Sequence, residues 1–97
     1  ILTVDRSYFY STGERYQFYI DGGIYLLNLL YALHHFKIAA CPANWGKDFT
    51  ADNKVRKFAD IPESEKIICM IPIGEAREEI AVTLSYRRTV DEVLKIL

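Results

Sequence analysis

The stretch that decides the fold is residues 20–46, IDGGIYLLNLLYALHHFKIAACPANWG. Within residues 24–33 only Asn28 is plainly polar, so a helix here is apolar on almost every side and must be covered on most of them. The small apolar residues 38–41 then predict a short buried strand, which Pro42 ends because proline has no amide hydrogen to donate. A buried helix, a buried strand and an aromatic loop therefore follow one another directly. We expect the function to lie at that loop.

The start of this helix has two solutions. Ser11 and Glu14 fit a capping box, which predicts a helix over about residues 12–36 that contains the glycine pair 22–23. Alternatively, Asp21 caps a shorter helix that begins at the first of these glycines. Each glycine inside a helix costs about 1 kcal/mol relative to alanine, so we expect something to pack closely against the backbone there.

A second, shorter helix is predicted to begin at Thr50 or Asp52 and to end near residue 59, before Ile61-Pro62. Its apolar residues are expected to point inward and its basic residues outward. The inward pair is Val55 and Phe58, and the outward set is Lys54, Arg56 and Lys57.

The remaining segments alternate between strand and helix patterns. Residues 1–4 predict a strand, and residues 65–73, EKIICMIPI, predict a strand that is buried on both faces and ended by Gly74. After a charged turn, residues 80–84 are expected to be extended. A second capping box at residues 89–92 then opens a closing helix that runs to the end of the sequence.

Composition excludes several classes of protein. With 97 residues the sequence holds one domain at most, and its net charge of −1 offers no basic excess for a nucleic-acid partner. The apolar run at residues 24–36 is shorter than the roughly 20 residues that span a bilayer, so no membrane segment is predicted. Cys41 and Cys69 each lie in an apolar run, which favours buried thiols in a reducing, cytoplasmic environment.

No set of side chains resembles a catalytic or metal centre. His34 and His35 point about 100° apart on a helix, so they cannot share one metal ion, and we expect no metal site. The pair Gly22-Gly23 lacks the further glycines and lysine of a phosphate-binding loop, and Cys41 has no evident base beyond those histidines. We therefore predict no catalytic side chain, and chemistry supplied by a cofactor if the protein is an enzyme.

Two segments could hold such a cofactor. The loop at residues 42–46, PANWG, can present backbone amides and one large ring to a planar ligand, or it is a turn with a packed tryptophan. Ser85, Arg87 and Arg88, followed by the helix start at Thr89, can form a phosphate clasp, or the arginines are simply solvated.

In their order and spacing, these segments resemble the C-terminal half of the nitroreductase family of FMN-dependent oxidoreductases. The similarity covers residues 16–93 and includes DGGIYLLNLLYAL, IAACPANWG, the helix before Ile61-Pro62, IPIG and SYRRTVDEV. It implies an α+β fold with an antiparallel sheet flanked by helices. Residues 1–97 would then be the C-terminal part of a single domain, about half of the family fold. The Arg-rich stretch near the family's N-terminus has no counterpart here.

The resemblance also implies a function and the residues that serve it. The protein would be an FMN-dependent oxidoreductase that takes hydride from NAD(P)H and passes it through flavin N5 to an electron-poor small molecule. The ring would lie against Pro42, Ala43, Asn44 and Trp45, with the amides of the last two reaching N5 and O4, and the phosphate would be held by Ser85, Arg87 and Arg88. The family is an obligate homodimer with FMN in the interface, so the apolar helix would pack partly on a partner. The alternative is a non-catalytic flavin-binding or dimerisation module.

Overall fold

The centre of the structure is an irregular antiparallel ladder of two chain segments. The structure is a computed structural model that describes residues 1–79 and 81–96. In it, β2 (Ile38–Ala40) pairs with β5 (Ile73–Glu75), and β3 (Ala43–Asn44) pairs with β4 (Glu65–Met70) in the same register. The two short ladders are separated where Pro42 and Pro72 interrupt the backbone donors. Between them, the amide of Cys41 donates to the carbonyl of Pro72 at 3.1 Å.

This ladder corrects the predicted strand at residues 65–73. The extended segment is broken after Met70 and resumes at Ile73, and Gly74 lies inside β5 opposite Ala39 instead of ending the strand. The expected strand at the N-terminus is present as β1 (Leu2–Asp5), which pairs antiparallel with the other edge of β4. The three-stranded sheet therefore has the order β1-β4-β3.

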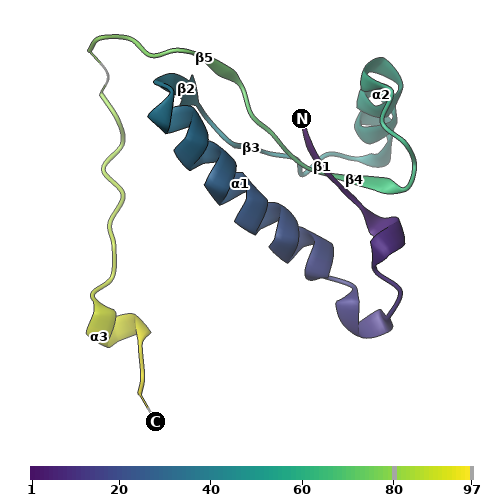
Figure 1. Cartoon of the computed structure of the whole chain (residues 1–97), viewed down its shortest axis with the longest axis horizontal. Coiled ribbons are helices and arrows are strands. Elements are labelled where there is room, and N and C mark those ends of the chain that lie inside the picture. The colour runs from purple at the N-terminus through teal and green to yellow at the C-terminus, as the bar shows by residue number, and fades with distance from the viewer. Residues whose placement is uncertain (80, 97) are drawn as a thin grey trace.

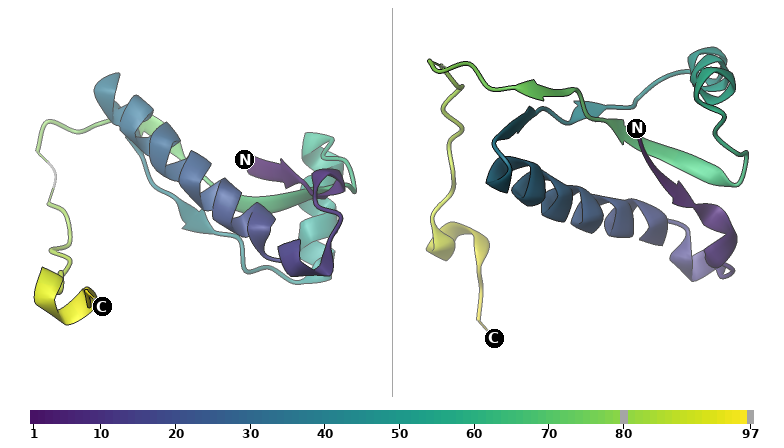
Figure 2. Two further views of the ribbon diagram at one scale, coloured as in Figure 1. Left: turned by 60° about the horizontal axis from the view of Figure 1, so that its bottom comes forward. Right: turned by 45° about the horizontal axis from the view of Figure 1, so that its top comes forward.

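The long helix α1 (Gln17–His35) crosses one face of these strands, and both views in Figure 2 agree on this. The capping box of Ser11 and Glu14 exists, but it closes a separate turn of 3-10 helix, η2 (Thr12–Glu14). The helix itself begins at Gln17, five residues later than the first prediction. The alternative start at Gly22 is wrong too, because the Asp21 carboxylate lies within the helix and accepts from the Gln17 side-chain amide at 2.9 Å.

One stripe of α1 packs on the sheet. Gly22 is buried there, so close to Ile68 and Val4 that an added Cβ would lie 2.9 Å from the Ile68 side chain. This is the close packing expected of the glycine pair, but it holds for Gly22 only, since a Cβ at Gly23 would meet nothing within 4 Å. The rest of the helix is open. Its exposed large apolar residues are Tyr19, Ile20, Ile24, Tyr25, Leu27 and Tyr31.

The second helix, α2 (Phe49–Ala59), begins earlier than predicted because Asp48 caps it, accepting from the Ala51 amide at 2.8 Å. It ends at Asp60, which adopts a left-handed conformation with φ 52°. Two orientations differ from the prediction. Phe58 is 91% exposed and does not point inward, whereas Arg56 is partly buried by its ion pair with Asp52.

The C-terminal tail leaves the sheet and runs apart from it (Figure 1). Residues 81–89 pair in no sheet, so the segment predicted to be extended at 80–84 belongs to no strand where the structure describes it, and Ile80 lies outside the described residues. The capping box at Thr89 and Glu92 is confirmed, but it opens only the single turn α3 (Val90–Val93). The predicted end of this helix at Leu97 lies outside the described residues as well.

Little of the chain is fully buried. Ile67 and Cys69 on β4 are the buried apolar residues, and Cys41, predicted to be buried, is exposed. The chain has a solvent-accessible surface of 8761 Å², against about 5,700 Å² for a compact protein of its 11.2 kDa mass. Its radius of gyration of 16.9 Å likewise exceeds the roughly 12.5 Å of a compact chain of this length. The remaining element, η1 (Arg6–Tyr8), links β1 to η2 along the surface.

Candidate functional site

The predicted flavin-ring segment, residues 42–45, includes β3 of the central ladder and leads from β2 toward α2. Pro42, Ala43 and Asn44 are exposed, and Ala43 and Asn44 form β3 instead of a free loop. Their pairing with Met70 and Cys69 fixes the backbone of this segment to the most buried strand of the chain. The sequence had placed the segment directly after a buried strand, and the structure adds that the sheet itself holds it.

The side chain of Trp45 is turned toward α2. Its indole Nε1 donates to Asp52 Oδ1 at 2.8 Å, and the residue is half-buried. The carboxylate of Asp52 also accepts from Arg56 Nε at 2.6 Å. These hydrogen bonds, first from Trp45 and then from Arg56, hold the pKa of Asp52 below its usual value despite partial burial. The indole is therefore held against α2, while residues 42–44 beside it are exposed.

The sequence analysis treated Asp52 only as a possible helix start and did not predict that its carboxylate accepts hydrogen bonds from Trp45 and Arg56. Two signals pointed to it. The spacing Asp52–Arg56 is the i,i+4 pattern of a helical ion pair, and Trp45 precedes that helix closely enough to need a partner for its N–H.

The predicted phosphate clasp lies on the tail. Ser85, Arg87 and Arg88 are exposed, and Arg87 Nη1 donates to the Ser85 hydroxyl, so one guanidinium and one hydroxyl do lie together. The helix that follows adds little for an anion. It is one turn long, and the Glu92 carboxylate already accepts from the Thr89 amide at 2.8 Å.

The structure does not bring the two predicted groups together within one chain. Residues 42–45 lie at the central ladder, whereas Ser85, Arg87 and Arg88 lie on the detached tail (Figures 1 and 2). Pro42 lines a cavity of about 830 Å³. The other walls of this cavity are formed by the end of α1, by β2, and by Ala76 and Val82 of the tail. Lys37, which has a left-handed backbone with φ 58°, lines that cavity together with His34.

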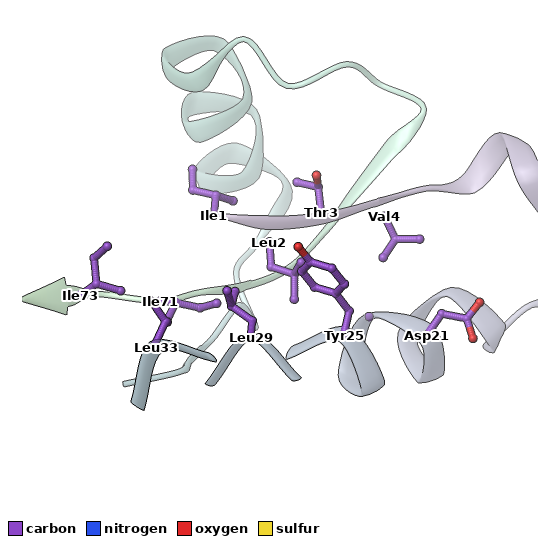
Figure 3. Close-up of a pocket in the computed structure, with 11 residues that line it drawn as sticks. Ile1, Leu2, Thr3, Val4, Asp21, Tyr25, Leu29, Leu33, Ile71 and Ile73 are labelled. Carbon is purple, nitrogen blue, oxygen red and sulfur yellow. The ribbon is translucent and has the colours of Figure 1, made fainter. Parts of the chain in front are cut away.

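A second cavity, of about 660 Å³, opens between β1 and α1, away from the predicted site. Figure 3 shows Leu2 on the β1 side of it and Tyr25 and Leu29 on the α1 side, with Ile71 close to Leu33. Its lining is predominantly apolar. We read it as uncovered sheet–helix surface, because the same strands and helix form the only core the described residues have.

The two histidines lie in the last turn of α1, where a positive charge is favoured by the helix dipole. Among residues 1–79 and 81–96 no group of three or more histidine, cysteine or acidic side chains is placed to hold a metal ion. Nor is any helix in those residues both long and apolar enough to cross a bilayer.

Comparison with known proteins gives one match. The model of the nitroreductase family matches residues 2–75, which extend from β1 through β5 and include the segment at 42–45. The tail with Ser85, Arg87 and Arg88 lies beyond the matched range. The searches of curated proteins and of solved structures returned no match.

Proposed function

The chain belongs to the nitroreductase family, whose model matches residues 2–75. On this basis we propose that the protein is an FMN-dependent NAD(P)H oxidoreductase. The observation that carries this proposal is that the matched range includes the sheet-anchored segment Pro42–Trp45. When bound, the flavin supplies hydride transfer through its N5 atom, from NAD(P)H to an electron-poor acceptor.

The residues of the site fit a flavin in two ways. The segment 42–44 is exposed yet fixed by β4, so its backbone can meet a flat ring without reordering. Ser85 and Arg87 already lie within hydrogen-bonding contact of each other, and with Arg88 they offer two guanidinium groups to a phosphate. Pro42, Ala43, Asn44 and Trp45 are thus proposed to bind the ring, and Ser85, Arg87 and Arg88 the phosphate.

We further propose that the working form is a homodimer of a larger fold, in which residues 1–97 are the C-terminal part of a single domain. The separation of the two groups supports this, because one chain as it stands cannot clasp one ligand with both. The surplus of about 3,000 Å² of exposed surface supports it too, because a permanent interface that buries roughly 2,000–5,000 Å² over both partners covers about 1,000–2,500 Å² of each chain and leaves surface for the rest of the fold to cover. Sedimentation analysis of the full protein should show a dimer.

The decisive experiment is an FMN titration of the protein and of an Arg87→Ala/Arg88→Ala variant, followed by flavin absorbance and fluorescence. We expect the wild type to bind FMN and the double variant to lose about 100-fold in affinity, as expected for two charge-assisted contacts. Arg77→Ala is the matched control, because Arg77 is an exposed arginine of the same tail outside the clasp. A wild-type protein that takes up no flavin would end the proposal.

The exposed apolar face of α1 also favours a second candidate, a non-catalytic flavin-binding or dimerisation module. NAD(P)H oxidation separates the two. The oxidoreductase consumes NAD(P)H when an electron-poor acceptor is added, whereas the module binds its partner or flavin and consumes none.

A further inference from the structure

The carboxylate of Asp52, in the first turn of α2, joins that helix to the segment at 42–45. One of its oxygens accepts from the Trp45 indole at 2.8 Å and the other from Arg56 Nε at 2.6 Å. Arg56 continues the chain of contacts by donating Nη1 to the carbonyl of Pro62 at 2.9 Å. The side chains of Asp52 and Arg56 are only 17% and 13% exposed, so the network is largely shielded from water.

Pairing with β4 holds one side of this segment, and the Asp52 network ties its Trp45 end to α2. β3 is two residues long, and the chain leaves it at Trp45 before Asp48 caps α2. Holding the indole ties Trp45 to α2, and because the allowed side-chain rotamers depend on the local backbone dihedrals, it also narrows the conformations open to the peptide groups on both sides of the Trp45 Cα. Ionisation suits this role, because a carboxylate accepts two donors at once and forms the stronger, charge-assisted kind of hydrogen bond.

We propose that Asp52 is a positioning residue for the flavin edge: it fixes Trp45 through the indole and so sets the peptide groups at Asn44 and Trp45 that face the ring. The role rests on the proposed flavin site, although Asp52 itself is assigned no contact with the flavin. Arg56 holds Asp52 in place and connects it to Pro62, just before β4.

The contact itself can be tested without flavin. In protein labelled with 5-fluorotryptophan, the fluorine resonance that disappears in Trp45→Phe belongs to Trp45. We expect Asp52→Ala to shift and broaden this resonance, and Asp52→Asn, which keeps an acceptor oxygen, to retain most of the wild-type shift. Asp48→Ala is the matched control, because it removes the cap of the same helix without touching Trp45. An Asp52→Ala resonance identical to the wild-type one would overturn the proposed contact.

The consequence is tested on the FMN-loaded protein. We expect Asp52→Ala to bind FMN about tenfold more weakly, the size of one lost hydrogen bond to a charged group, and to change the reduction potential of the flavin. Trp45→Phe should have a similar effect, and the double variant little more than either single one, because both remove the same contact. Asp48→Ala should bind FMN as the wild type does.

The outcomes separate the two proposals. If the wild-type protein binds no FMN, both the proposed function and the flavin role of Asp52 are refuted. Normal FMN binding with an unaltered affinity and potential in Asp52→Ala removes the positioning role alone. Equal losses in Asp48→Ala and Asp52→Ala also remove it, because the effect would then come from weakening α2 as a whole.

Discussion

Replacing Gly22 by alanine should destabilise the chain relative to the same replacement at Gly23. Both lie in α1, so each alanine gains about 1 kcal/mol of helix propensity, and this gain cancels in the comparison. The surroundings differ. A Cβ at Gly22 would lie 2.9 Å from Ile68 Cγ1 and 3.2 Å from Val4 Cγ2, whereas one at Gly23 meets nothing within 4 Å.

The expected difference is the cost of forcing one methyl group into this helix–sheet contact, about 1–3 kcal/mol. Ile68 is β-branched and Val4 is held in β1, so neither can swing aside freely. Gly22→Ala is thus expected to be about 0–2 kcal/mol less stable than the wild type, and Gly23→Ala about 1 kcal/mol more stable.

Urea unfolding followed by far-UV circular dichroism measures this difference as a separation of midpoints, on the order of 1 M if the m-value is unchanged. Measurements at two protein concentrations show whether a second chain covers Gly23, since a loss that grows on dilution would come from an interface. If Gly22→Ala is as stable as Gly23→Ala at both concentrations, the close packing of α1 on β4 is refuted.

Three further outcomes follow from the described contacts. Folding lowers the pKa of Asp52, so the stabilisation by its carboxylate is present above the ordinary carboxyl pKa range and is lost as the pH falls through the lowered pKa. The free energy of unfolding should therefore decrease less steeply with acid in Asp52→Asn than in the wild type. The same decrease in both proteins would contradict the contact. The exposed Cys41 should react rapidly with a thiol reagent, whereas Cys69, whose pKa is raised by burial, should react only on unfolding; a fast phase that survives Cys41→Ala would refute this. Ile67→Ala should cost about 2–5 kcal/mol in urea unfolding, against about 0.5 kcal/mol or less for the exposed Lys54→Ala, because Ile67 is only 2% exposed; equal costs would contradict a core centred on β4.

Local chemistry made the main elements predictable. The apolar run at 24–33 required a helix, the prolines at 42 and 72 interrupt the strands they adjoin, and both capping boxes form. The predicted ends of helices and strands were wrong where the local sequence is compatible with two structures. The Ser11–Glu14 box is satisfied by a single turn of 3-10 helix, so it does not determine where α1 begins. Similarly, Pro72 interrupts a strand that backbone pairing then resumes at Ile73.

Orientation was harder to predict, because it depends on partners distant in sequence. Phe58 lies on the expected face of an amphipathic helix, yet the described residues place nothing over it and it stays exposed. From the sequence, the side chain of Trp45 could have been a ligand platform or a packed ring, and its hydrogen bond to Asp52 shows that the indole is held against α2. The distance between residues 42–45 and the arginines of the tail was also beyond sequence reasoning, since no periodicity encodes where residues 81–89 run.

The two sides of α1 account for the mismatch between a strongly apolar helix and a sparsely buried chain. Gly22 and the half-buried Leu26, Leu29 and Leu33 face the strands, and this stripe uses about one side of the helix. The opposite residues, among them Ile24, Leu27 and Tyr31, are 55–68% exposed. Burying such side chains is worth roughly 1.5–3 kcal/mol each. Apolar side chains that are this exposed indicate that another protein surface covers this face of α1. The same helix is followed by β2 and then by the segment at 42–45. Because α1 is followed by β2 and then by the proposed flavin edge, we expect assembly and cofactor binding to be linked, and the two should be measured together.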